Sequence, residues 1–157
     1  MTVGGGQAIA LGADAGEEAQ VIKTFEETVK AFGKVDVVFA NAGITNLPLH
    51  FTELTPDDFE RTLKTNVIGV FLCFKHAALQ FKKQNSPGSM LATASVAGIR
   101  SGAGGTDYSA SKAAVINLVQ TTANQLAGTG IRVNAICPVH KQKRKHTAVL
   151  KCHYFRA

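Results

Sequence analysis

Hydrophobic residues recur at helical spacing in three stretches of the chain. The first covers residues 16–32 and stops at Gly33, a residue that commonly ends helices. The second begins at Thr55, which is followed by Pro56 and two acids, and continues through the apolar stretch 59–81. Threonine as cap and proline in the first turn are typical of a helix start. The third stretch covers residues 108–127, so the pattern predicts three long helices.

Four short apolar runs alternate with these helices. They cover residues 7–11, 35–40, 90–94 and 131–137, and glycine, proline or polar turn residues bound them. Nearly continuous apolar runs of this length are typical of strands buried in a parallel sheet. The order strand, helix, strand, helix, strand, helix, strand predicts an open parallel sheet with helices on both faces.

Composition divides the chain into a neutral part and a basic part. A length of 157 residues with 45% hydrophobic residues fits one domain with one core. Residues 1–139 carry 11 basic and 11 acidic side chains, so the net charge of +6 belongs to residues 140–157, which contain no acid. We expect a domain at 1–139 and a basic, disordered tail at 140–157. Such a tail could bind nucleic acid, but the absence of interleaved aromatic residues argues against it.

Cysteine usage and apolar runs bear on location. The three cysteines, Cys73, Cys137 and Cys152, are too scattered for a disulfide framework, which favours a reducing compartment. No apolar run approaches the length of a membrane span, and the first six residues lack the features of a signal peptide. The spacing of cysteine and histidine matches no standard zinc pattern, so no metal site is predicted. We expect a cytoplasmic protein that does not enter a membrane.

Tyr108 and Lys112 carry the candidate chemistry. They are four residues apart in a predicted helix, so their side chains lie on one face. An ammonium beside a phenol favours the phenolate, which would let the tyrosine exchange protons near neutral pH. Ser95 precedes the tyrosine by 13 positions, at the end of a predicted strand, where α/β proteins gather reactive groups. Taken alone, the pair could also be an exposed aromatic residue and a solvated lysine.

An ordered set of motifs over residues 7–138 resembles the classical short-chain dehydrogenase/reductase (SDR) family. Each motif alone is weak, whereas the ordered set is specific. The resemblance implies a Rossmann-like, doubly wound parallel sheet. The motifs are Asp14 after a strand, Asn41-Ala42-Gly43 after the next strand, Asn66 in a helix, Ser95-Val96-Ala97-Gly98, Tyr108-x-x-x-Lys112, and the segment 132–138 ending in Pro138.

The same resemblance implies an NAD(P)-dependent oxidoreductase that transfers a hydride between nicotinamide and a secondary alcohol or ketone. It implies Tyr108 as the general acid/base and Lys112 as its support. It implies Ser95 as the holder of the substrate oxygen and Asn66 as part of a proton relay. The implied partners are a small alcohol or ketone and further copies of the chain in a homodimer or homotetramer. The implied NAD or NADP site comprises Asp14, Asn41, Ala42, Gly43, Tyr108, Lys112 and Pro138.

Ordinary structural explanations exist for several of these residues. Asn66 stands in mid-helix, where asparagine has a low propensity, and it could be a buried amide bonded to neighbouring backbone. The family resemblance adds that this asparagine distorts the helix. Asp14 could simply cap the helix that follows it. Thr93, two residues before the serine, is interpreted as strand packing.

The resemblance also implies a chain truncated at both ends. Family members begin with a βαβ unit that carries a glycine-rich phosphate loop, and residues 4–6 do not fit that loop because no strand precedes them. The match stops near Pro138, so we expect the basic tail not to be native coding sequence. In the family's sheet order, the strand at 7–11 would lack a neighbour and the strand at 35–40 would form an open apolar edge. The alternative function is an inactive SDR fragment, or an interaction module that pairs through its long helices.

Overall fold

Three parallel strands form one sheet in a computed structural model that describes residues 6–46 and 50–139. The strands are β1 (Val37–Ala40), β2 (Gly88–Thr93) and β3 (Ile131–Ile136), in the order β1-β2-β3. All pairs are parallel, which confirms the predicted α/β sheet. The predicted tail at 140–157 lies outside the described residues.

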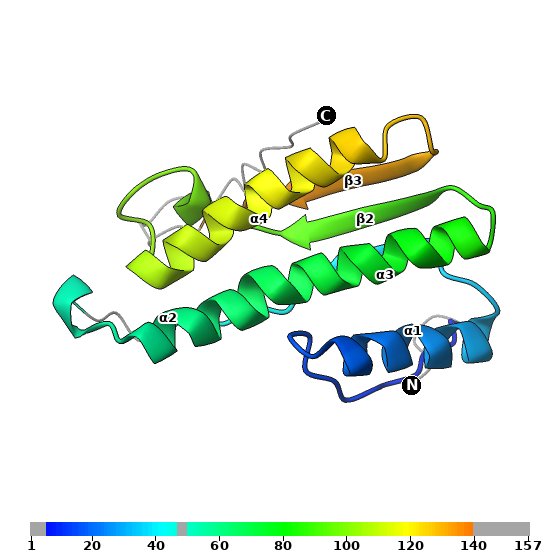
Figure 1. Ribbon diagram of the computed structural model, residues 1–157, viewed down its shortest axis with the longest axis horizontal. Coiled ribbons are helices and arrows are strands. Elements are labelled where there is room, and N and C mark those ends of the chain that lie inside the picture. Colours follow the sequence, from blue (N-terminus) through cyan, green and yellow to red (C-terminus); the bar gives the residue numbers. More distant parts are fainter. Residues whose placement is uncertain (1–5, 47–49, 140–157) are drawn as a thin grey trace.

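Four α-helices connect and flank these strands (Figure 1). A π-helical turn joins α2 to α3, so the predicted helix from Thr55 onward is continuous. The Thr55 side chain accepts a hydrogen bond from the Asp58 amide, which confirms the predicted cap. The helical elements are α1 (Glu18–Phe32), η1 (Phe51–Glu53), α2 (Pro56–Leu63), η2 (Lys64–Ile68), α3 (Gly69–Lys83), η3 (Val96–Gly98) and α4 (Thr106–Gln125).

The long helices α3 and α4 cover one face of the sheet. Strand side chains that face them are buried, as at Met90 and Val133, whereas Val37 and Phe39 on the other face of β1 are 66% and 49% exposed. Both crossovers step in the same direction along the sheet, so their usual right-handed path puts both helices on one side. Within residues 6–46 and 50–139, no helix covers the second face, so the prediction of helices on both faces is wrong for this part of the chain.

The prediction of a strand at residues 7–11 is wrong. This segment is irregular, and Ile9 and Leu11 are 47% and 42% exposed. A strand exists only through hydrogen bonds to a neighbour, and no described strand pairs with this segment. β1 is accordingly the edge strand of the sheet, with the exposed apolar residues that the family resemblance implied.

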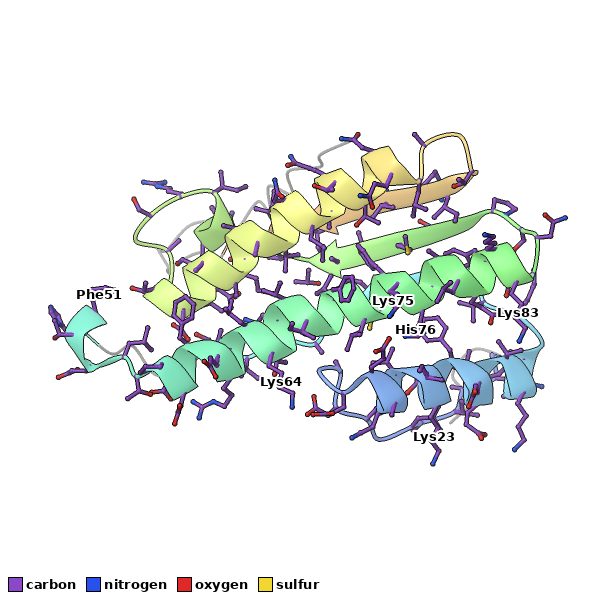
Figure 2. All side chains as sticks on the ribbon, viewed as in Figure 1. Lys23, Phe51, Lys64, Lys75, His76 and Lys83 are labelled. Carbon is purple, nitrogen blue, oxygen red and sulfur yellow. The ribbon has the colours of Figure 1, made fainter. Side chains whose placement is uncertain are left out.

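Ion pairs connect the start of α1 to α3 and to η2. Glu18 accepts a hydrogen bond from Lys75 Nζ at 2.7 Å and lies 2.9 Å from His76 Nε2, and Glu17 pairs with Lys64. Figure 2 shows Lys75 and His76 on the side of α3 that faces α1. The hydrogen bond from Lys75 has the largest effect and that with His76 the next, and together they hold the pKa of the Glu18 carboxyl below its usual value.

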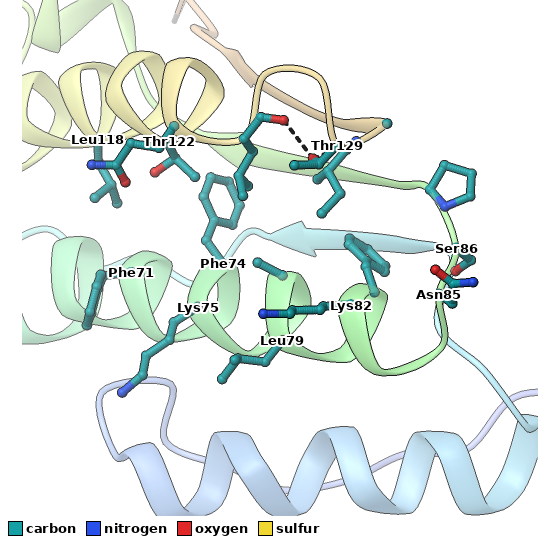
Figure 3. A pocket seen from close by; sticks show the side chains of 17 residues that line it. Phe71, Phe74, Lys75, Leu79, Lys82, Asn85, Ser86, Leu118, Thr122 and Thr129 are labelled. Carbon is teal, nitrogen blue, oxygen red and sulfur yellow. Dashed lines mark hydrogen bonds between the residues drawn. The ribbon is translucent and has the colours of Figure 1, made fainter.

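An apolar groove runs between α3 and the C-terminal half of α4 (Figure 3). Phe74, Leu118 and Leu126 line it, together with Phe71 and Leu79, which are 46% and 54% exposed. Large apolar side chains exposed along one groove are a common mark of an interaction surface.

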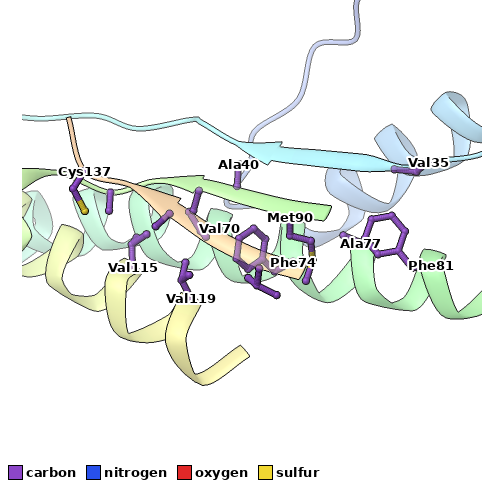
Figure 4. Packing of buried hydrophobic residues seen from close by; sticks show 14 residues of the cluster. Val35, Ala40, Val70, Phe74, Ala77, Phe81, Met90, Val115, Val119 and Cys137 are labelled. Atoms are coloured by element: carbon purple, nitrogen blue, oxygen red, sulfur yellow. The ribbon is translucent and has the colours of Figure 1, made fainter. Parts of the chain in front are cut away.

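The hydrophobic core lies between the sheet and the helices (Figure 4). Phe81 of α3, Met90 of β2 and Val115 of α4 are fully buried there. None of the helices among the described residues combines the length and the apolar character needed to cross a bilayer.

Candidate active site

The candidate site lies where the three strands end. The segments after β2 and β3 remain paired, because the Ala94 amide donates to the Ile136 carbonyl at 2.9 Å and the Val96 amide donates to the Pro138 carbonyl at 3.1 Å. The segment Asn41–Gly43 follows β1 at the same edge. Parallel sheets place their ligand sites at this edge.

Tyr108 and Lys112 lie together in the first turns of α4. Lys112 Nζ is 5.5 Å from the centre of the Tyr108 ring, within reach of a cation–π contact, as their spacing predicted. The lysine is only 3% exposed, and its ammonium donates to the Thr93 carbonyl at 2.7 Å. Burial lowers the pKa of Lys112 because water no longer solvates its charge.

The lowered pKa of Lys112 predicts a pH-dependent stability. The unfolded chain keeps this proton up to a pH of about 10.4, whereas the folded chain releases it at a lower pH, so stability rises with pH between the two values. We expect Lys112→Met to be more stable than the wild type near neutral pH, with a difference that narrows as the pH approaches about 10. Urea unfolding at several pH values measures this difference. Lys83→Met on the exposed part of α3 is the control, and a gap that stays constant for Lys112→Met would contradict the prediction.

Asn66 lies at the centre of a buried hydrogen-bond network between the loop after β1 and α4. It lies in the π-helical turn η2, is 0% exposed, and its Oδ1 accepts from the Ile44 amide at 2.7 Å. Its Nδ2 donates to the Ile44 carbonyl and to Ser111 Oγ, both at 2.9 Å. The structure therefore contains both features that the sequence suggested: an amide bonded to backbone, and a distorted helix. Asn66 connects the loop after β1 to α4.

Replacement of Asn66 by alanine is expected to destabilise the fold by about 2–4 kcal/mol, since it leaves buried groups of Ile44 and Ser111 without partners. Chemical denaturation measures the change. Asn117→Ala, at an exposed position of α4, is the matched control and should change stability by less than about 0.5 kcal/mol. Similar losses in both variants would show that the amide network does not hold these elements together.

Thr93 and Gly43 bring the loop after β1 against the lysine. Thr93 belongs to β2 and pairs with Ile136 of β3, and its Oγ1 also donates to Asn41 Oδ1 at 2.7 Å. Its side chain holds the loop while its carbonyl holds Lys112. A Cβ atom at Gly43 would lie 3.4 Å from Asn66 Oδ1 and 3.5 Å from Lys112 Nζ. The loop, the amide and the amine are therefore in contact.

Ser95 is buried at the start of η3. Its Oγ accepts from the Ala97 amide at 3.1 Å, and no hydrogen bond joins it to Tyr108 among the described residues. Gly98 lets this segment press against the backbone of α4, where a Cβ atom would lie 2.5 Å from the Lys112 carbonyl carbon. Cys137 is buried beside the serine segment, and burial raises the pKa of its thiol.

Asp14 lies apart from this cluster. Its Oδ1 accepts from the Gly16 amide at 2.8 Å and its Oδ2 is 4.0 Å from Lys64 Nζ. Nothing in the described part of the chain joins it to Tyr108 or Lys112. The simpler interpretation of Asp14 as a helix cap is wrong, because the N-cap of α1 is Glu17 and no side chain caps it. Asp14 instead bonds within the turn that precedes α1.

Three further polar residues next to the site escaped the sequence analysis. Asp107 is 3% exposed, and its Oδ2 accepts from Asn46 Nδ2 and from Thr62 Oγ1, both at 2.7 Å. An aspartate in the first turn of a helix normally faces water, so sequence gave no reason to expect burial. The one available signal was its position directly before Tyr108.

The fold and this cluster define an α/β protein with a buried polar site at the carboxyl ends of parallel strands. The sequence model of the family described as short chain dehydrogenase matches residues 2–143. The chain belongs to this short-chain dehydrogenase family.

Relatives from plants and bacteria share this sequence pattern. Short-chain dehydrogenase reductase 3a of Arabidopsis thaliana is 37% identical over 138 residues, which cover 88% of this chain and 54% of the relative. The 3-oxoacyl-[acyl-carrier-protein] reductase of Synechocystis is 37% identical over 134 residues, covering 85% of this chain and 53% of the relative. The chain thus spans about half the length of the curated relatives it matches.

Solved structures show the same fold. The NAD+-bound xylitol dehydrogenase is 40% identical with a TM-score of 0.75, over 80% of this chain and 48% of that chain. ElxO with NADP bound is 32% identical with a TM-score of 0.74, over 80% of this chain and 50% of that chain.

Proposed function

We propose that the protein is an NAD(P)-dependent oxidoreductase that transfers a hydride between nicotinamide and a secondary alcohol or ketone. The burial of Lys112 beside Tyr108 carries this proposal. A buried amine with a lowered pKa costs stability, and such groups gather at functional sites. Membership of the dehydrogenase family supports it.

Each polar residue of the cluster has a proposed task. Tyr108 exchanges the proton with the substrate oxygen, and Lys112 supports it electrostatically. Ser95 donates its hydroxyl proton to the same oxygen while its Oγ still accepts from the Ala97 amide. Asn66 keeps the loop after β1 and α4 in place for a proton relay.

The residues at the strand ends fit a nicotinamide dinucleotide. Residues Asn41–Gly43 are exposed at the sheet edge, where a backbone with small side chains allows close approach of a ligand. Lys112 offers a cation to the ribose, and Pro138 borders the same edge. When bound, NAD or NADP supplies the hydride acceptor or, in its reduced form, the donor. Asp14 is proposed for the adenine side, at the other end of the site.

A thermal melt of the chain with saturating NADH or NADPH tests the proposal. A ligand at about 100 times its Kd stabilises the folded state by about 2.7 kcal/mol, so the midpoint should rise with at least one nucleotide. Lys112→Met should reduce this rise, and Lys83→Met should not. A midpoint that neither nucleotide changes would overturn the proposal.

The groove between α3 and α4 favours a second proposal, pairing of two copies of the chain. Its exposed residues Phe71 and Leu79 would be covered by the same helices of a second copy. Leu79→Glu should then convert the dimer to monomer in analytical ultracentrifugation, whereas Gln120→Glu on an exposed part of α4 should not. A chain that pairs but binds no nucleotide would be an interaction module. We also propose a cytoplasmic location.

A further inference from the structure

The first turn of α4 carries a buried carboxylate that the proposed reaction does not use. Asp107 comes from α4, Asn46 from the loop after β1, and Thr62 from α2, and both partners reach Asp107 Oδ2 at 2.7 Å. Asn46 is itself held by Arg61, whose guanidinium also pairs with Asp58 at 2.9 Å. Two hydrogen bonds to one buried oxygen therefore join this end of the helix to α2 and to the loop after β1.

Glycines precede Asp107 at the start of α4. The N-cap of α4 is Gly105, which provides no side-chain cap. The preceding segment contains Gly102, with φ of +76°, and Gly104, and both are exposed. The Tyr108 ring packs on Gly104, where a Cβ atom would lie 2.9 Å from Tyr108 Cδ1. Because the helix start has no side-chain cap, its bonds to α2 and to the loop after β1 come from Asp107.

The next turn of α4 is anchored separately. Ser111 Oγ accepts from Asn66 Nδ2 at 2.9 Å and donates to the Tyr108 carbonyl at 2.7 Å. Tyr108 therefore sits between two buried anchors, Asp107 on one side and Ser111 on the other. Asp107 is hydrogen-bonded to Asn46 in the loop after β1, and Asn66 is hydrogen-bonded to Ile44 in the same loop.

We propose that Asp107 is a positioning residue of the Tyr108 site, which docks the first turn of α4 on Thr62 and Asn46 and so sets the direction of the phenol. This inference rests on the proposed oxidoreductase function, because Tyr108 matters only if it reacts. A carboxylate that merely stabilised the fold would change the melting temperature without changing the surroundings of the phenol in the folded state.

Tyrosine labelled with ¹³C at Cζ provides a direct readout, since the chain has two tyrosines and Tyr108→Phe assigns their signals. Spectra are recorded well below the melting temperature of each variant. Asp107→Ala should shift or broaden the Tyr108 signal. Asp107→Asn removes the charge but keeps an acceptor oxygen, and it should keep a signal close to the wild type. Asp57→Ala, an exposed aspartate in the first turn of α2, is the control.

Thr62→Val is the second variant, because it keeps the side-chain shape and removes one donor to Asp107. Thr62→Val should move the Tyr108 signal in the same direction as Asp107→Ala does. It also replaces Asp107→Ala in the test if that variant does not fold. In nucleotide titrations, Asp107→Ala should lose about tenfold in affinity for the nucleotide that the wild type binds.

The outcomes separate the two proposals. If the wild type binds neither nucleotide, the oxidoreductase function fails, and the tyrosine spectra still decide the role of Asp107. If nucleotide binds but Asp107→Ala and Thr62→Val leave the Tyr108 signal unchanged, the positioning role is overturned and the function stands. A signal that moves equally in Asp107→Asn and Asp107→Ala would assign the effect to charge and overturn the role as well.

Discussion

Replacing Tyr108 by phenylalanine is expected to remove the proton-transfer step and to leave the fold unchanged. Positioned general acid/base groups contribute about 10²–10⁴-fold to a rate, so hydride transfer should fall by that factor. The ring remains, and the phenol makes no hydrogen bond to other described residues, so stability should stay within about 0.5 kcal/mol. Stopped-flow absorbance of NADH or NADPH with an alcohol or ketone substrate measures the rate.

The comparison of binding with turnover makes this expectation specific. Nucleotide binding should survive in Tyr108→Phe, because the aromatic ring and Lys112 both remain. Tyr154→Phe, at the other tyrosine of the chain, is the control and should keep the full rate. Turnover by Tyr108→Phe within a few-fold of the wild type would exclude the tyrosine as acid/base.

A methyl group at Gly98 is expected to cost about 3 kcal/mol, the upper part of the usual range for overpacking. The added Cβ would lie 2.5 Å from the Lys112 carbonyl carbon and 2.7 Å from both the Lys112 carbonyl oxygen and the Ala113 amide nitrogen. These atoms belong to the backbone of α4, so no rotamer change relieves the clash. The segment that carries Ser95 must then move away from the helix that carries Tyr108.

Urea unfolding of Gly98→Ala measures this cost, and Gly12→Ala is the matched control. No atom lies within 4 Å of a Cβ at Gly12, so that variant should be neutral or slightly more stable through a less flexible unfolded chain. Loss of nucleotide-dependent stabilisation in Gly98→Ala alone would connect this contact to the site. Equal midpoints for the two alanine variants would contradict the close packing of η3 on α4.

Lys112 shows why stability and chemistry are opposed at this site. Its burial costs free energy, because the folded state disfavours the proton that the unfolded state keeps. Asn66, by contrast, stabilises the fold while it holds the loop next to the lysine. The same few residues therefore combine an unfavourable charge with the bonds that keep it in place.

Local pattern by itself determined the helices and the pairing of Tyr108 with Lys112. Helical periodicity, a capping threonine and a following proline act within a few residues, so the helix from Thr55 could be predicted from sequence. A spacing of four residues fixes one helix face regardless of the rest of the fold. The ordered motifs also carried the resemblance to the family that the comparisons then showed.

Only the tertiary structure decided which of these residues meet, and how. Residues 7–11 have the composition of a strand, but a strand requires a hydrogen-bonded neighbour that the described chain does not place there. The local sequence indicates only strand packing for Thr93 and a helix start for Asp107. In the structure, Thr93 bonds to Asn41, 52 positions away, and so holds the loop after β1. Asp107 bonds to Thr62 and Asn46, 45 and 61 positions away, and so holds the start of α4. Hydrogen bonds between distant segments depend on how the sheet and helices pack, and no local pattern records them.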